Sequence, residues 1–247
     1  MRDLMIVLMV VLDCFVPRFV FFACGKNDVV HEVLDCFVPR NDGSNFPRSD
    51  GGQVNDGKQD PDAIIRQTLQ IYDEWGGVEA KFSVNIQQNG ASQSFEGSIT
   101  VKNDKFALVT PDMLVWFDGK TQWTYLSRND EVNISEPNGA DLRAINPLFF
   151  LRDYNKDFKA SYIGESTSAN ARTAHDLRLT PKKKDDIENI DVQIEKASHL
   201  PVRIVAALTN GMRNTVTIRE ITASKQPDNA FVFPAERFPN VEIIDLR

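Results

Sequence analysis

Several features common in enzymes and nucleic-acid-binding proteins are scarce in this sequence. No cysteine follows residue 36, since Cys14, Cys24 and Cys36 are the only three. The rest of the chain therefore has no disulfide and no cysteine metal site, which fits an oxidising compartment. The 28 basic residues are outnumbered by 35 acidic ones, giving a formal net charge of −7. This balance argues against nucleic-acid binding and against tight docking to anionic lipid.

Catalytic motifs are missing as well. The part expected to fold has two histidines, His175 and His199, on separate predicted strands, and no nucleophile elbow, phosphate-binding loop, dinucleotide fingerprint or zinc-binding histidine pair. We therefore expect no catalytic residue, no metal, no cofactor and no enzymatic activity. The alternative is an enzyme acting on lipid or envelope polymer, which would need a titratable cluster such as a histidine buried beside a carboxylate.

Long hydrophobic runs are also absent. The apolar stretch Leu4–Leu12 ends at Asp13 and resumes only at Phe19–Ala23, too short to span a bilayer, which takes about 20 apolar residues. Residues 1–24 are instead predicted to be a secretory signal. Ala23-Cys24-Gly25 suggests a lipoprotein processing site, although an unmodified cysteine is the simpler interpretation.

Residues 25–59 are predicted to be a disordered linker. The segment VLDCFVPR occurs at 11–18 and again at 33–40, and two copies are too few for a stacked repeat. The residues after the second copy are rich in Asn, Asp, Gly and Ser. We expect a single folded domain over residues 60–247.

That domain begins with a predicted helix. Asp60-Pro61 is an N-cap followed by proline at the first helical position, and apolar residues recur at three- and four-residue spacing up to Trp75. Gly76-Gly77 is expected to end the helix.

The stretch Glu79–Glu136 alternates apolar and polar residues, with turn dipeptides such as Asn89-Gly90 and Asp118-Gly119 between the runs. This pattern predicts an antiparallel meander with one buried face. The residues assigned to the inner face are unusually aromatic: Phe82, Phe95, Phe106, Trp116, Trp123 and Tyr125. Trp116 and Trp123 flank a tight turn, so they either pair across a hairpin in the core or line a pocket.

The alternation stops between Asn138 and Tyr154, where Pro147 interrupts a very apolar segment. We interpret this segment as helical and as a lid over the inner face, with an ordinary packing helix as the alternative. The residues expected to contact the sheet are Leu142, Ile145, Leu148 and Phe149.

Alternation then returns from Phe158 and closes the chain with Phe231–Phe233 and Val241–Leu246. The charged run Lys182–Asp186 is interpreted as a solvated hairpin tip, or else as a docking patch for an acidic partner. The predicted fold is antiparallel and β-rich (α+β), with about ten to eleven strands and two or three helices on one side of the sheet.

Two or three short helices cannot cover the apolar face of so long a sheet. Either the sheet closes on its own side chains, or it stays concave and holds an apolar ligand. The second arrangement predicts lipid-binding residues along the strands: Phe82, Phe95, Ile99, Phe106, Leu108, Trp116, Trp123 and Tyr125.

The order of these elements resembles a known family. An amphipathic helix ends in Trp75-Gly76-Gly77; Gly97-x-Ile99 and Lys105-Phe106 follow; and the most specific block is Trp116-Phe117-Asp118-Gly119-Lys120-Thr121-x-Trp123-x-Tyr125. Together with Ile145-Asn146-Pro147 and the ending Val241–Arg247, this is similar to the periplasmic outer-membrane lipoprotein carriers of LolA type, over about Pro61 to Arg247.

The resemblance implies an incomplete, unclosed β-barrel whose concave face is covered by the helices. It also implies a monomeric periplasmic chaperone that takes acylated lipoproteins from an inner-membrane ABC transporter and passes them to an outer-membrane receptor of related fold. The alternative within the same fold is a membrane-anchored lipoprotein receptor or lipid sensor, tethered through Cys24. In one respect the chain departs from the family. The Arg-Pro that typically follows the strand ending at Lys102, and ties the lid shut, is here Asn103-Asp104, so Lys102 or Lys105 would have to take its place.

Overall fold

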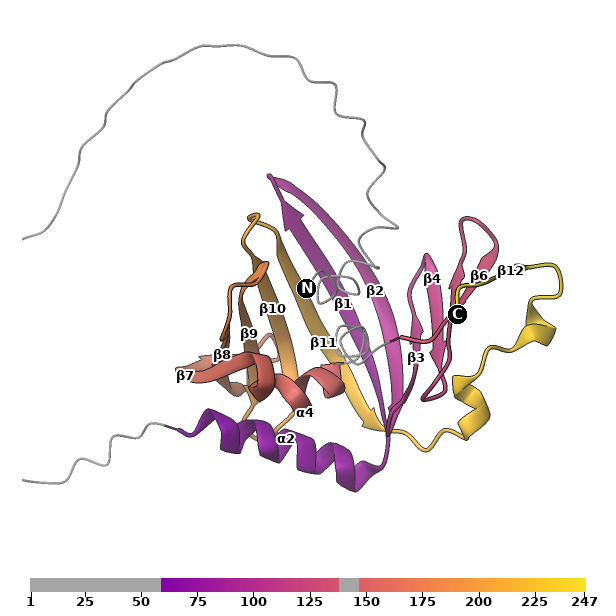
Figure 1. The fold of residues 1–247 in the computed structure, drawn as a ribbon. Helices are drawn as coiled ribbons and strands as arrows, with labels where there is room; N and C mark the ends of the chain where they lie inside the picture. The colour runs from indigo at the N-terminus through magenta and orange to yellow at the C-terminus, as the bar shows by residue number, and fades with distance from the viewer. Residues whose placement is uncertain (1–58, 138–146) are drawn as a thin grey trace, which may run out of the picture. The chain divides into compact units, whose positions relative to one another are not determined.

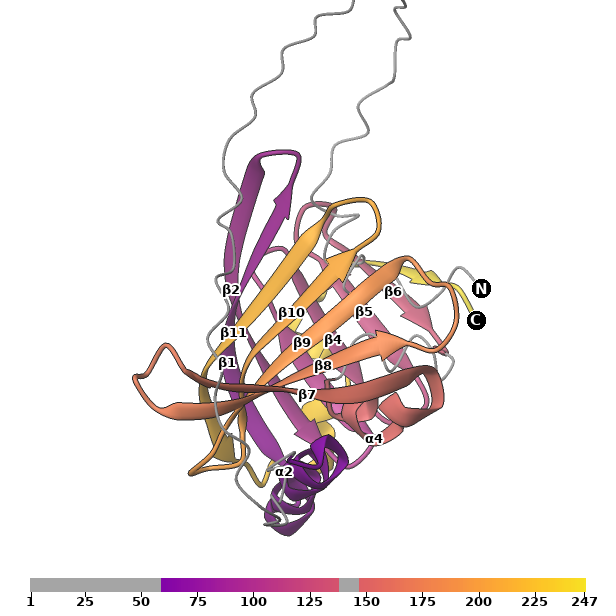
Figure 2. The same ribbon diagram turned by 90° about the vertical axis from the view of Figure 1, so that its left-hand side faces the viewer.

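In the computed structural model, which describes residues 59–137 and 147–247, one large antiparallel sheet bends around two helices (Figures 1 and 2). The strands are β1 (Val78–Gln88), β2 (Ala91–Lys102), β3 (Lys105–Val109), β4 (Met113–Phe117), β5 (Gln122–Leu126), β6 (Glu131–Ser135), β7 (Phe158–Thr167), β8 (Thr173–Pro181), β9 (Ile187–Glu195), β10 (Pro201–Leu208), β11 (Arg213–Ala223) and β12 (Glu242–Asp245). The helices are α2 (Pro61–Trp75) and α4 (Pro147–Asp157), with 3₁₀ helices η1 (Asp228–Phe231) and η2 (Ala235–Arg237).

The sheet is open. Its twelve strands run in the order β12-β6-β5-β4-β3-β2-β1-β11-β10-β9-β8-β7, so β12 and β7 are its two edges. Every pairing is antiparallel except that of β12 with β6. The unclosed, β-rich fold predicted from the sequence is confirmed, with a strand count slightly above the expected ten to eleven.

Helix α2 begins and ends where the sequence predicts. The Asp60 carboxylate accepts a hydrogen bond from the Asp62 backbone N–H at 3.0 Å. Gly76 ends the helix in the left-handed conformation, with φ of 67°, which glycine adopts without a Cβ clash. Ile64 and Ile65 are buried on the side of α2 that faces the sheet.

The inner face of the sheet packs against the helices in two hydrophobic clusters. The first joins Ile64 and Ile65 of α2 and Leu151 of α4 to strands β1 and β7–β10. The second joins Tyr72 of α2 to strands β1–β4. Because α2 contributes to both clusters, it lies across the bend of the sheet, as Figure 1 shows.

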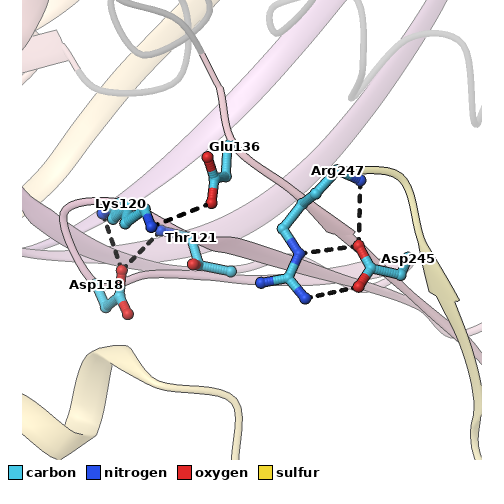
Figure 3. A network of polar contacts seen from close by, with 6 residues as sticks. All are labelled: Asp118, Lys120, Thr121, Glu136, Asp245 and Arg247. Carbon is cyan, nitrogen blue, oxygen red and sulfur yellow. Dashed lines mark hydrogen bonds and ion pairs between the residues drawn. The ribbon is translucent and has the colours of Figure 1, made fainter.

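Most predicted turns are confirmed. Asn89 and Gly90 both have positive φ between β1 and β2, as a two-residue hairpin turn requires. The Asp118 carboxylate accepts from the backbone N–H groups of Lys120 and Thr121 at 2.9 and 2.8 Å, which fixes the turn before β5 (Figure 3). The charged run at 182–186 connects β8 to β9 and is largely exposed, as expected of a hairpin tip.

The segment Phe231–Phe233 does not form the strand that its apolar pattern suggests. Phe231 ends the 3₁₀ helix η1, and Pro227 and Pro234, which lack a backbone N–H, flank the segment. Residues 1–58, which contain the predicted signal and linker, and Leu142 and Ile145 of the predicted lid lie outside the described residues.

Candidate lipid-binding face

An apolar row crosses seven neighbouring strands on the inner face. Paired positions in the register place these side chains next to one another, from β2 through β1 and β11–β8 to β7: Phe95, Val84, Val216, Ile204, Val192, Leu177 and Tyr162. Val84, Val192 and Leu177 are buried, whereas Phe95, Val216, Ile204 and Tyr162 are only partly so. The row therefore keeps apolar surface that the protein does not fully cover.

Phe82 of β1 lies between the two clusters and packs against both. Its register partner on β2 is Gly97, and a Cβ on Gly97 would lie 2.8 Å from Cζ of the Phe82 ring. The absence of a side chain at Gly97 is thus what leaves room for the ring.

The structure puts five of the predicted lipid-binding residues on the inner face. Phe82 and Phe95 are partly exposed there. Ile99, Phe106 and Leu108 are 7%, 0% and 6% exposed and belong to the second cluster. They are therefore core residues of the inner face. Their binding of lipid remains a prediction.

The other three, Trp116, Trp123 and Tyr125, were assigned to the wrong face. Phe106 is paired with Phe117, so Trp116, the residue before it, points to the opposite side of β4. Trp116 pairs with Trp123, and Tyr125, two residues further along β5, shares its side of the sheet. All three lie on the outer face, away from α2 and α4, so they cannot line a site between the sheet and these helices.

On the outer face, aromatic residues of the C-terminal segment pack against Trp116 and Tyr125. The Phe233 ring lies 5.4 Å from that of Trp116, and the Phe238 ring lies 6.1 Å from Trp116 and 4.7 Å from Tyr125, in edge or tilted arrangements. Such geometries are favourable for aromatic pairs. A small second core therefore forms between β4–β5 and residues 233–238, which sequence alternation alone did not reveal.

Two lysines fasten the same segment. Lys102 and Lys105 each donate from Nζ to the Asp228 carboxylate at 2.8 Å, and these hydrogen bonds lower the pKa of Asp228 to about 2. The sequence interpretation offered either lysine as the residue that ties the lid shut. Instead, both hold η1 beside β3, on the outer face.

Helix α4 is held against α2. Arg152 pairs with Asp73, and the Tyr154 hydroxyl donates to Asp62. Leu151 and Tyr154 are 1% and 7% exposed, so α4 packs at these two positions as an ordinary helix does. Leu148 and Phe149 lie in its first turn. The lid remains a prediction.

His175 is buried on the inner face of β8, opposite Glu165 of β7. Its Nδ1 lies 3.4 Å from the Tyr162 hydroxyl, and the Glu165 carboxylate accepts from Lys196 Nζ at 2.6 Å. Burial lowers the pKa of His175, which favours a neutral imidazole. Among the described residues, no group of three or more His, Cys, Asp and Glu side chains is placed to hold a metal ion.

One inner-face residue escaped the sequence interpretation. Asn214 of β11 is 1% exposed, and neither its Oδ1 nor its Nδ2 has a hydrogen-bond partner among the described residues. It precedes the inner-face Val216 by two positions, so alternation marks its side, but no pattern in the sequence signals an unpaired amide.

Comparison with known families shows which family the chain belongs to. The family model described as outer membrane lipoprotein carrier protein LolA matches residues 56–207, more than half of the sequence. The chain belongs to the LolA family. An uncharacterized protein of Methanocaldococcus jannaschii is 23% identical to it over 146 residues, which is 58% of this chain and 43% of that protein. The chain thus spans less than half the length of this relative.

Comparison with solved structures finds proteins of similar fold. An uncharacterized conserved protein from Thermus thermophilus superposes with a TM-score of 0.52 at 11% identity, over 74% of this chain and 97% of that one. A LolA superfamily protein from Nitrosomonas europaea superposes with a TM-score of 0.40 at 9% identity, over 70% of this chain and 97% of that one.

In the described part of the chain, no helix has the length and apolar character to cross a membrane.

Proposed function

We propose that this LolA-family protein binds the acyl chains of lipoproteins between the inner face and the helices α2 and α4, and carries them through the periplasm from the inner to the outer membrane. The observation that supports this most directly is the apolar row from Phe95 to Tyr162, whose members on four strands are only partly covered. Each CH₂ group removed from water contributes about 0.8 kcal/mol, so even partial insertion of a long chain stabilises the complex substantially.

The carrier acts as a monomer and without catalysis. An inner-membrane ABC transporter supplies the lipoprotein, and an outer-membrane receptor accepts it. Delivery to the receptor requires that the bound acyl chains be released again. An open sheet suits release because its inner face is stable without being completely filled. Arg152 pairs with Asp73, and Tyr154 pairs with Asp62. Both are contacts between α4 and α2 that would break if α4 moved away as a lid.

A matched pair of substitutions tests the proposal. Phe95→Asp places a carboxylate on the partly covered inner row, where its desolvation opposes an acyl chain. Val109→Asp makes the same chemical change on β3 at an apolar position that is 48% exposed on the outer face. We expect F95D to lose lipid that co-purifies with the wild-type protein, and to lose transfer of a purified acylated lipoprotein to outer-membrane vesicles, while V109D retains both.

Circular dichroism of both variants checks that they are folded. Retention of lipid and transfer by a folded F95D, or equal loss in V109D, would argue against binding at the inner row.

A further inference from the structure

Strand β11 contains a β-bulge where it pairs with β1. Phe82 of β1 is paired with Ile218. Two residues earlier on β1, Ala80 is paired with Ile221, which lies three residues further along β11. The extra residue is Arg219, and such an insertion shifts the side chains that follow it by one position. Because side chains alternate along a strand, a separation of three would otherwise put Ile218 and Ile221 on opposite faces. The bulge puts both on the inner face.

The inner-face residues around this bulge form a continuous apolar strip. We call Val216, Ile218 and Ile221 of β11, together with Ala80 and Phe82 of β1, the β11 strip. All five side chains are partly exposed. Val216 packs against the first hydrophobic cluster and Ile221 against the second, whereas Ile218 packs against neither of these clusters of described residues. The strip therefore lies where the two clusters meet and where the core leaves apolar side chains incompletely covered.

The outer positions of the same two strands are polar. Thr215, Thr217 and Arg219 are the outer residues on β11, and Lys81 and Ser83 are the outer residues on β1. The apolar character of the strip is thus confined to the inner face. Contiguous apolar surface that stays partly exposed marks a place that a ligand or a partner covers.

An acyl chain on the inner face could follow the strands or cross them. The row that crosses the strands from Phe95 to Tyr162 is interrupted on β9 and β8, where Val192 and Leu177 are 2% and 1% exposed. Both belong to the first cluster with Leu151 of α4, so a chain on this route would have to displace side chains of that cluster. The β11 strip, by contrast, is partly exposed at each of its positions.

The length of the strip suits one acyl chain. At about 3.3 Å per residue, the distance along β11 from Val216 to Ile221 is about 16 Å. The acyl chains of one leaflet fill half of a bilayer core that is about 30 Å thick, so each extends over about 15 Å. An extended chain and the strip therefore have nearly the same length.

We propose that an acyl chain lies lengthwise on the β11 strip, parallel to β1 and β11, rather than across the strands. The bulge at Arg219 makes the strip continuous because it keeps Ile218 and Ile221 on the same face. This inference rests on the proposed binding of acyl chains to the inner face and adds the direction of the chain and the residues that hold it. At Val216 the strip meets the row that contains Phe95, so the two share this part of the inner face.

A matched pair of substitutions tests the strip. Ile221→Asn and Ile187→Asn place the same amide at partly covered positions of the inner face, one on the strip and one on β9, away from both the strip and the crossing row. Binding of palmitate to the full chain is measured by displacement of a polarity-sensitive fluorescent dye. We expect I221N to bind palmitate about tenfold more weakly than wild type, because the amide must lose its water to admit the chain. I187N should stay within about twofold of wild type, and circular dichroism checks that both variants are folded.

Photo-crosslinking of the wild-type protein tests the direction of the chain without any substitution. Two palmitate probes carry a diazirine, one at mid-chain and one at the chain end, and mass spectrometry locates the labelled peptides. Both probes should label residues 78–88 of β1 or 213–223 of β11. Labels that fall on separate strands, one on β2 and the other on β9 or β10, would show a chain that crosses the sheet.

That crosslinking result, or an equal loss of affinity in I221N and I187N, would overturn the lengthwise arrangement while leaving the carrier proposal in place. If wild type does not bind palmitate, the carrier proposal fails and the lengthwise arrangement fails with it.

Discussion

The ring of Phe82 lies directly over Gly97 of the neighbouring strand, where a Cβ would come within 2.8 Å of Cζ. The pairing matters because Phe82 is the inner-face residue that contacts both hydrophobic clusters. Gly97 thus permits a single side chain to join the two halves of the core at the bend of the sheet.

Gly97→Ala is therefore expected to destabilise the protein by about 1–3 kcal/mol, as overpacking does. The new methyl group would clash both with the Phe82 ring and with the Val109 carbonyl oxygen, 2.7 Å away. Urea denaturation measures the loss. Glu96→Ala, at the neighbouring exposed position, should change stability by no more than about 0.5 kcal/mol. Equal stability of G97A and wild type would show that the ring moves aside freely.

Removal of Trp116 should affect the C-terminal segment rather than the binding face. Trp116→Ala takes away the ring that contacts Phe233 and Phe238, and we expect a loss of about 2 kcal/mol because the site is partly exposed. Hydrogen exchange of residues 228–245 should accelerate while lipid co-purification persists. Loss of bound lipid with unchanged hydrogen exchange would instead indicate that Trp116 contacts the lipid.

The attachment of η1 to β3 should weaken in strongly acidic solution. The pKa of Asp228 is lowered to about 2 by Lys102 and Lys105, so the stabilisation is fully present above the ordinary value of 3.8 and is lost as the pH falls through about 2. Asp228→Asn should remove that dependence and expose the C-terminal segment to protease already at pH 7. A wild-type digestion pattern in D228N would contradict this role.

His175 should make the protein less stable in mildly acidic solution. Burial lowers its pKa below the ordinary 6.5, so the unfolded chain takes up a proton that the folded chain does not. Stability is thus greatest above about pH 6.5, declines as the pH falls toward the lowered pKa, and then levels off. Near the imidazole lie Lys196, Glu165, His199 and Asp176.

Denaturation midpoints between pH 7.5 and 5, in wild type and in His175→Gln, measure this effect. The variant should show a shallower decline, since glutamine takes up no proton. Parallel curves for the two proteins would assign the decline to another group.

The sequence by itself determined the local structure and the fold class. The caps of α2 and the turn at Asn89-Gly90 are encoded within a few residues, and the structure has them where they were predicted. Alternation likewise predicted a β-rich antiparallel sheet with one buried face. These features depend on backbone preferences and on hydrophobic period, which neighbouring residues set.

Only the tertiary structure decided which face of β4 and β5 is the inner one. The run Met113–Phe117 is apolar at every position, so alternation could not distinguish the side of Phe117 from the side of Trp116. The choice depends on register across β3 and on cover from Phe233 and Phe238, more than a hundred residues away in the sequence. The unpaired amide of Asn214 was hidden for the same reason: its surroundings are made by strands β1 and β10, which only folding brings to its sides.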